Sequence, residues 1–201
     1  MSRDLFPDRP QAAAAAVVIG ASAGAVEALI RILPELPEDY PLPLMIVVHL
    51  PPDRESTLAA LLNTRCRITV KEAEDKEPIR PGTAYLAPPD YHLLIEPEFL
   101  LSLSNEEPVL YSRPSIDVLF ESAADAYGSG LTGIILTGAN SDGARGLRAV
   151  RAAGGLALVQ IPEEADADTM PRAALAACPG ARALTLAQIT GALKTELPRA
   201  L

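Results

Sequence analysis

Uninterrupted apolar runs alternate with helix-like spacing along this chain of 201 residues. Apolar runs rich in β-branched residues predict strands that are buried on both faces. We expect such strands at residues 17–19, 44–50, 133–138 and 156–160, with shorter ones at 68–70 and 84–87. Apolar residues three or four positions apart predict amphipathic helices between these strands. We expect these helices at 25–33, from Glu55 or Ser56 through 62, at 115–127, at 144–153, from near Pro171, and at 186–197.

This alternation predicts an α/β fold, with a doubly wound, mostly parallel sheet covered by helices in a Rossmann-like three-layer arrangement. Residues 92–96 and 100–104 flank a proline-containing turn, which predicts a β-hairpin insertion. The chain has no internal repeat or flexible linker, so we expect one domain over residues 13–198. Residues 1–12 carry no hydrophobic signal core and predict a disordered tail.

Composition and charge narrow the class of protein. A formal net charge of −9 argues against a nucleic-acid partner, because phosphate neutralisation requires a basic face. No apolar run reaches the roughly 18 residues of a membrane span, so membrane insertion is not expected. Cys66 and Cys178 match neither a metal-ligand spacing nor a disulfide framework. These features favour a reduced, cytoplasmic protein.

A serine bracketed by glycines follows the first predicted strand, in the segment Gly20-Ala21-Ser22-Ala23-Gly24. Strand, G-x-S-x-G and helix is the layout of a nucleophile elbow, where a tight turn exposes a serine hydroxyl. The turn also places Ser22 at a helix N-terminus, which favours negative charge. The alternative is a phosphate-holding turn in a non-catalytic ligand- or protein-binding module. The segment lacks the G-x-G-x-x-G pattern and the P-loop lysine that this alternative would favour.

Two further polar residues lie where an open α/β sheet binds its ligands, beyond the carboxyl ends of the strands. His49 ends the strand at 44–50, and Asp142 follows the strand at 133–138. A serine hydroxyl needs a base within about 3 Å, and that base needs a carboxylate to fix its tautomer. We therefore expect Ser22 as nucleophile, His49 as base and Asp142 as orienting acid, with Nδ1–H toward Asp142 and Nε2 toward Ser22.

Each of these residues also has a structural interpretation. His49 is alternatively a buried imidazole satisfied by a backbone carbonyl. Asp142 is alternatively the N-cap of the helix that follows it, unless Ser141 takes that role. His92 ranks second as the base. The acids that would replace Asp142 are Asp117 and Asp90. The chain order serine, histidine, aspartate also differs from the order in α/β-hydrolases.

Motifs in order along the chain resemble the catalytic domain of chemotaxis protein-glutamate methylesterases (CheB type). They are Gly20–Gly24, Val48–Pro52, Val70–Asp75, Pro81–Pro88, Arg113–Phe120, Leu136–Ala144 and Met170–Ala173. The resemblance covers about residues 17–193 and implies a serine hydrolase with Ser22, His49 and Asp142 as its triad. It implies γ-methyl esters of glutamate on chemoreceptor signalling helices as substrates, with glutamine deamidation in some members, and neither metal nor organic cofactor.

The resemblance also suggests which residues assist the reaction. Backbone N–H groups of Ala23 and Ala139 are the candidates for holding an oxyanion. The candidates for the substrate region are Arg113, Met170 and Arg172.

The chain departs from the family pattern at several positions. Well-studied members carry an N-terminal receiver domain, whereas about sixteen residues precede the first predicted strand here. We therefore expect activity that is constitutive or controlled by a separate regulatory protein. Ala139 and Asn140 stand where the usual T-G-M-G-N-D-G loop has methionine and glycine, and Ala23 replaces the usual threonine. Residues 106–112 also differ, which bears on receptor docking.

Overall fold

The computed structural model describes residues 15–49 and 57–195. The tail expected at 1–12 and the helix start expected at Glu55 or Ser56 lie outside these residues. Seven strands form one sheet in the order β3-β4-β2-β1-β7-β8-β9, and every pairing is parallel. Their bounds are β1 Ala16–Ala21, β2 Leu44–Val48, β3 Thr69–Glu72, β4 Thr83–Leu86, β7 Leu131–Ile135, β8 Leu156–Gln160 and β9 Arg182–Leu184. The predicted α/β fold class is confirmed.

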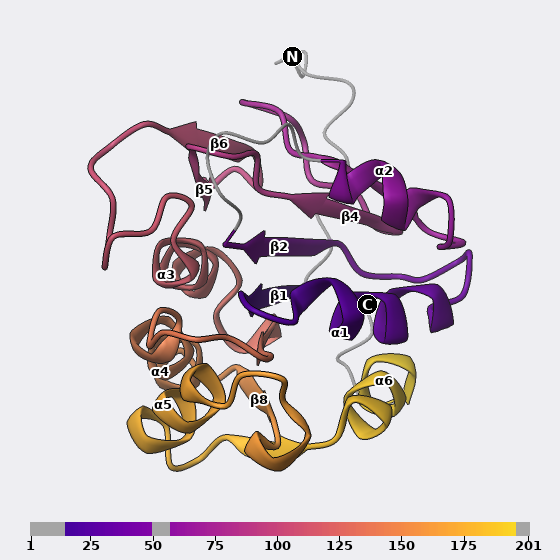
Figure 1. Cartoon of the computed structure of the whole chain (residues 1–201). Helices are drawn as coiled ribbons and strands as arrows, with labels where there is room; N and C mark the ends of the chain where they lie inside the picture. The colour runs from indigo at the N-terminus through magenta and orange to yellow at the C-terminus, as the bar shows by residue number, and fades with distance from the viewer. Residues whose placement is uncertain (1–14, 50–56, 196–201) are drawn as a thin grey trace, which may run out of the picture.

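Helices cover both faces of this sheet (Figure 1). One face is covered by α1 (Ala25–Ile32), α2 (Leu58–Asn63) and α6 (Leu186–Thr195). The other is covered by α3 (Ile116–Tyr127), α4 (Ala144–Ala152) and α5 (Thr169–Ala177). Short 3₁₀ turns lie at Leu33–Glu35, Gly128–Gly130 and Pro162–Glu164.

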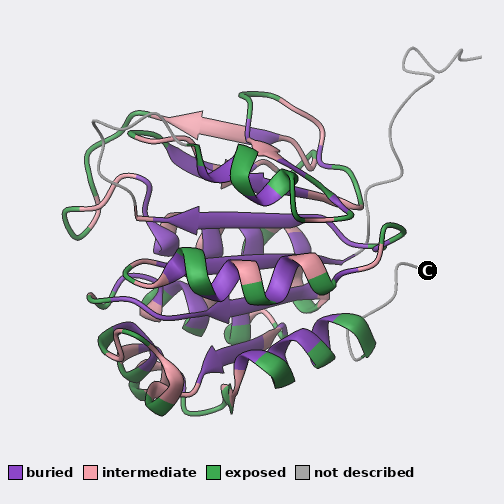
Figure 2. Ribbon diagram, turned by 45° about the vertical axis from the view of Figure 1, so that its right-hand side comes forward, coloured by how far each residue is buried: buried purple, intermediate pink, exposed green. Residues whose placement is uncertain are grey.

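The hydrophobic core forms two layers, one on each face of the sheet. Along β1, Val17 and Ile19 pack toward α1, whereas Ala16 and Val18 pack toward α3. Because both faces of the pleat are covered, the central strand β1 is buried throughout, and the exposed residues lie mostly on the outer sides of the helices and in the loops (Figure 2). No helix within the described residues is long and apolar enough to cross a membrane.

The predicted hairpin is present as a separate two-stranded sheet, formed by β5 (His92–Ile95) and β6 (Leu101–Ser104). It packs beside α3 at the carboxyl end of the main sheet. It therefore lies close to any site at that edge of the sheet.

The order in which strands are added to the sheet reverses at β1. The next strand, β2, lies on one side of β1, and the later strand β7 lies on the other. Ligands of open α/β sheets bind at such a switch point. The N–H of Ser22 bonds the carbonyl of Thr137 at 2.9 Å, and the N–H of His49 bonds that of Ala21 at 3.2 Å. The carboxyl ends of β1, β2 and β7 therefore lie side by side.

Two similar turns lead from this edge into α1 and α4. Each is closed by one hydrogen bond, from Ala25 N–H to the Ser22 carbonyl at 3.0 Å and from Ala144 N–H to the Ser141 carbonyl at 3.3 Å. In both, the third residue is a glycine with positive φ, 81° at Gly24 and 91° at Gly143. A type II turn requires this left-handed conformation, so the sequences S-A-G-A and S-D-G-A are suited to the same geometry.

Gly20 is required for a different reason, close approach of β1 to α3. A Cβ at this position would lie 2.3 Å from Cγ2 of Ile116. We expect Gly20→Ala to lower the free energy of unfolding by about 1–3 kcal/mol, because such overpacking must push back the first turn of α3. Urea denaturation measures this change. Gly191→Ala is the matched control, since nothing lies within 4 Å of that Cβ, and it should stabilise α6 by about 0.5–1 kcal/mol. An unchanged Gly20→Ala midpoint would contradict the expectation.

Candidate active site

The imidazole of His49 and the carboxylate of Asp142 are hydrogen-bonded, with 2.9 Å between Nε2 and Oδ2. His49 follows β2 directly, and Asp142 lies in the turn between β7 and α4, 93 residues further along the chain. The Asp142 side chain is fully buried, whereas the His49 side chain retains 12% of its exposure. The pair therefore presents one edge of a histidine to solvent with a buried carboxylate behind it.

Asp142 also caps the N-terminus of α3. Its carboxylate accepts hydrogen bonds from the N–H groups of Ile116 and Asp117 at 2.7 and 3.0 Å, and from the Ser115 hydroxyl at 2.9 Å. Burial acts to raise the pKa of Asp142, but the hydrogen bonds from His49 and from these N–H groups outweigh it, so the pKa is lowered. The carboxylate is therefore held in its ionised form.

The two helices beside the site cap each other. Asp142, which precedes α4, caps α3, while Asp117 in the first turn of α3 accepts a 2.7 Å hydrogen bond from the N–H of Gly146 in α4. Burial is the main cause that raises the pKa of Asp117, and the nearby Asp142 charge adds to it. Ser115 occupies the N-cap position of α3 without capping it, because its hydroxyl donates to Asp142 instead.

The imidazole of His49 is turned the opposite way from the expected orientation. Nε2 faces Asp142, and Nδ1 lies 3.1 Å from Nδ2 of Asn140. Because an ionised carboxylate only accepts, the proton lies on Nε2 and Nδ1 carries the lone pair. The expectation of Nδ1–H toward Asp142 was therefore wrong. The loop geometry explains the difference, since Asn140 offers Nδ1 a donor that the sequence pattern did not anticipate.

Ser22 is half-buried in the turn between β1 and α1. The parallel register pairs Ala21 with Val48, the last residues of β1 and β2. Ser22 and His49 directly follow them and are therefore neighbours at the ends of the two strands. Among the described residues, no hydrogen bond joins the Ser22 hydroxyl to His49. The structure thus brings His49 and Asp142 into contact and places Ser22 beside them without a direct bond.

Two backbone N–H groups flank this position. Ala23 and Ala139 are both exposed, and neither N–H donates a hydrogen bond to any residue that the structure describes. Buried Thr137 holds the two segments together, since its hydroxyl donates to the Ala23 carbonyl at 2.8 Å. The N–H of Thr137 bonds Oε1 of buried Gln160 at 2.9 Å. The N–H groups of Ala23 and Ala139 therefore belong to segments that are held in place by the hydrogen bonds of Thr137.

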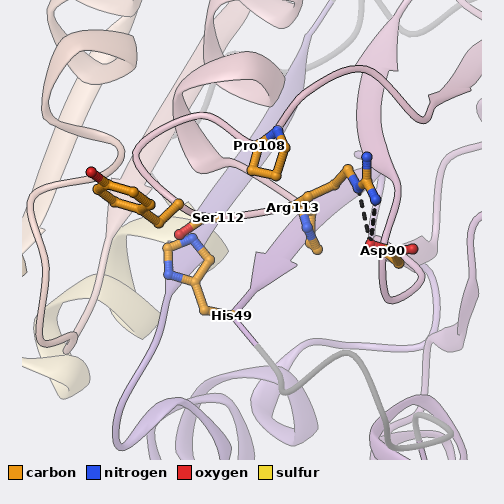
Figure 3. Close-up of a pocket in the computed structure, with 7 residues that line it drawn as sticks. His49, Asp90, Pro108, Ser112 and Arg113 are labelled. Carbon is orange, nitrogen blue, oxygen red and sulfur yellow. Dashed lines mark hydrogen bonds and ion pairs between the residues drawn. The ribbon is translucent and has the colours of Figure 1, made fainter.

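A pocket of about 220 Å³ opens beside His49 (Figure 3). It is lined by His49, Asp90, Pro108, Tyr111, Ser112, Arg113 and Pro114. The guanidinium of Arg113 turns toward Asp90, whose Oδ1 it binds through Nη2 at 2.7 Å and Nε at 3.0 Å. Its Nη1 donates to the carbonyls of Asn105 and Glu106. Arg113 thus lines the pocket mainly by holding in place the loop that forms one wall of the pocket.

The remaining candidates lie away from this pocket. Met170 is 1% exposed and packs against Gly138, where a Cβ would meet the methionine sulfur at 2.7 Å. It therefore supports the loop after β7, and its role in the substrate region stays a prediction. Arg172 is exposed on α5 and pairs with Asp168 at 2.7 Å.

His92, the second choice as base, is buried within the framework. Its Nδ1 accepts the N–H of Ser115 at 3.1 Å, and its Nε2 donates to the carbonyl of Glu107 at 3.2 Å. Both ring nitrogens are therefore occupied. Within the described residues, no group of three or more histidine, cysteine or acidic side chains is arranged to hold a metal ion.

Sequence reasoning missed the contact of Asn140 with His49 and the capping of α3 by Asp142. No pattern in the sequence pointed to the second contact, because Ser115 is itself a favoured N-cap residue and could have capped α3. No pattern pointed to the first contact either.

A parallel α/β sheet with a histidine hydrogen-bonded to a buried aspartate, beside a serine turn, is typical of a hydrolase-like class of protein. The CheB methylesterase family model matches residues 17–193, so the chain belongs to the CheB methylesterase family. A solved structure, the CheB methylesterase catalytic domain of Thermotoga maritima, superposes with a TM-score of 0.86 at 33% identity, covering 89% of this chain and 96% of that one.

Relatives in other bacteria agree with this assignment. A Leptospira interrogans protein, provisionally named protein-glutamate methylesterase/protein-glutamine glutaminase, is 50% identical over 81% of this chain and 84% of its own length. A Cupriavidus metallidurans protein with the same name, without the provisional mark, is 46% identical over 80% of this chain. The present chain covers only 46% of that longer relative.

Proposed function

We propose that this protein is a serine hydrolase that removes methyl groups from glutamate γ-methyl esters on chemoreceptor signalling helices and deamidates glutamines there. The observation that carries the proposal is the hydrogen-bonded pair of buried Asp142 and partly exposed His49, which lies beside Ser22 at the switch point of the sheet. Membership of the CheB methylesterase family and the names of the relatives support the substrate class.

In the proposed reaction, the Ser22 hydroxyl oxygen attacks the ester carbonyl carbon while His49 takes its proton at Nδ1. Asp142 stabilises the resulting imidazolium through Nε2, and the N–H groups of Ala23 and Ala139 hold the oxyanion. Collapse breaks the bond to the methoxy group, which leaves as methanol with the proton from Nδ1. Water then hydrolyses the glutamyl-enzyme by the same route. A glutamine substrate would release ammonia in place of methanol.

The size of the pocket favours one side chain over a larger ligand. A volume of about 220 Å³ lies below the usual range of small-molecule sites, roughly 300–1,000 Å³. Ser22 does not line this space, so a glutamyl methyl ester attacked by Ser22 would enter it only at the His49 side, with the rest of the helix left outside. The surface around the opening of the pocket would then select the receptor substrate through its contacts with the helix.

We also propose the cellular setting. Residues 13–198 make up one catalytic domain that acts in the cytoplasm on methylated receptor helices. The two cysteines are unpaired, which suits a reducing compartment.

The experiment that tests the function is methanol release from methylated receptors of the same cell, with and without prior labelling by a serine-directed phosphonate. We expect turnover that the phosphonate abolishes, with the label on Ser22. Binding of receptor or ligand without turnover and without labelling would favour the non-catalytic binding module.

The tip of the loop beside the pocket offers a test of the protein-sized substrate. Val109 and Ser112 exchange backbone hydrogen bonds of 3.1 and 2.9 Å around Leu110 and Tyr111. Both central residues have positive φ, 48° and 63°, as in the type I′ turns that Asn-Gly favours. Leu110 is 54% exposed and Tyr111 fully so. Two large apolar side chains are thus held in a costly conformation at the rim of the pocket.

We expect the double variant Leu110→Asn/Tyr111→Gly to be more stable than the parent by about 1–2 kcal/mol, because the strain is relieved. The same variant should lose about tenfold in kcat/KM on methylated receptor, equivalent to about 1.4 kcal/mol, while hydrolysing a small methyl ester normally. Thermal unfolding and parallel rate measurements on the two substrates check both parts. Unchanged turnover of the receptor would show that the tip does not contact it.

A further inference from the structure

The side-chain amide of Asn140 is hydrogen-bonded to Nδ1 of His49, the atom that takes the serine proton in the proposed reaction. Its Nδ2 lies 3.1 Å from Nδ1 of His49, and its Oδ1 accepts the N–H of Asp142 at 3.1 Å. The second contact fixes which end of the amide faces the imidazole, because a backbone N–H requires the oxygen. Asn140 therefore donates a hydrogen bond to Nδ1.

Both nitrogens of the His49 ring are thus engaged in the resting structure. Nε2 donates to Asp142, and the lone pair on Nδ1 accepts from Asn140. A base can take a proton from the Ser22 hydroxyl only through a free lone pair. This agrees with the finding that no hydrogen bond joins Ser22 to His49 among the described residues.

We propose that Asn140 is a latch on the general base, which occupies the Nδ1 lone pair until a substrate ester is seated at Ser22. The proposal rests on the proposed function for its consequence, but its geometry does not depend on that function. Asn140 acts through His49 and is a positioning residue. Its side chain is half-buried in the loop before α4, so it has room to turn away without opening the core.

Breaking the hydrogen bond between Asn140 and Nδ1 adds to the activation free energy of the reaction. One neutral hydrogen bond contributes a modest free energy, so its removal should change kcat/KM by a measurable but limited factor. We expect Asn140→Ala to raise kcat/KM for a small methyl ester about fivefold, equivalent to about 1 kcal/mol. Asn140→Asp keeps the oxygen that accepts the N–H of Asp142 but replaces the donor with an acceptor. That variant should hold a proton on Nδ1 and lose at least about tenfold in kcat/KM at neutral pH.

The direct test is ¹⁵N NMR of the imidazole nitrogens, which needs no substrate. The chain has two histidines, so His92 serves as an internal reference. We expect Nδ1 of His49 to be unprotonated in the parent and in Asn140→Ala, with its resonance shifted when the amide donor is removed. In Asn140→Asp, Nδ1 should carry a proton. The His92 resonances should be the same in all three proteins.

Several results would overturn the latch. One is an unchanged Nδ1 resonance in Asn140→Ala; another is an unchanged or reduced kcat/KM in a variant whose unfolding curve matches the parent. If Asn140→Ala is too unstable to assay, Asn140→Asp decides the matter, because normal activity in that variant contradicts the proposal. Recording the spectra in a Ser22→Ala background separates the two hypotheses, since the latch contact should persist even if Ser22 is not the nucleophile.

Discussion

Replacement of Ser22 with alanine is expected to reduce methyl ester hydrolysis by about 10⁴-fold or more while leaving the fold intact. The serine hydroxyl is the proposed nucleophile, and a methyl group cannot form the glutamyl-enzyme. The free energy of unfolding should change by less than about 0.5 kcal/mol, because the hydroxyl makes no hydrogen bond to the described residues. Initial rates of methanol release and urea denaturation measure the two quantities.

Ser112 provides the matched control, because it lines the same pocket as His49 and its hydroxyl is likewise unpaired among the described residues. We expect Ser112→Ala to hydrolyse a small methyl ester within about threefold of the parent rate, a change of roughly 0.6 kcal/mol. If Ser112→Ala were the inactive variant and Ser22→Ala retained more than about a tenth of the parent turnover, the nucleophile would be Ser112.

Asp142→Asn is expected to damage turnover and stability together. The loss in turnover should approach the roughly 10⁴-fold that this change causes in serine protease triads, because an amide offers no charge to the imidazolium. Stability should fall by about 3 kcal/mol. The asparagine NH₂ cannot accept the hydrogen bonds that Oδ2 now receives from His49 and from the N–H of Ile116. Both losses are expected because Asp142 caps α3 as well as binding His49.

The pH dependence of unfolding separates these contributions. The folded pKa of Asp142 lies below its ordinary value of 3.8, so the ionised carboxylate contributes stability that is complete above that value. This contribution is lost as the pH falls through the lower, folded pKa. Asp142→Asn should lack that part of the acid dependence, and urea denaturation from neutral pH downward would show it.

Asp117→Asn is the control for helix capping without contact to His49. Asparagine keeps an oxygen for the N–H of Gly146, and the raised pKa of Asp117 indicates that its charge is poorly accommodated. We expect nearly unchanged turnover with little loss of stability. Equal inactivation of Asp117→Asn and Asp142→Asn would mean that the role of Asp142 is structural alone.

The sequence was sufficient for the parts of the fold that depend on continuous apolar runs. The central strands β1, β2 and β8 and the helices α1, α3 and α4 were predicted within a few residues, because covered parallel strands leave a strong pattern. Strand β9 was not predicted, since a three-residue edge strand has too little apolar content to stand out.

Contacts between side chains on different strands and loops could not be predicted from such patterns. The strand expected at 133–138 ends at Ile135, because the N–H of Thr137 bonds the Gln160 side chain in place of continuing the ladder. The orientation of the His49 ring depends on Asn140, a residue 91 positions away. Local sequence rules report on neighbours within a turn or strand, so they carry no information about such pairs.

The double role of Asp142 changes what its presence means in other chains with this fold. A protein that had lost the serine and the histidine, and with them any hydrolysis, would still need a carboxylate at position 142 to begin α3. Selection for folding alone would retain it. An aspartate at this position therefore marks the architecture, whereas a serine at 22 together with a histidine at 49 distinguishes an enzyme from an inactive descendant.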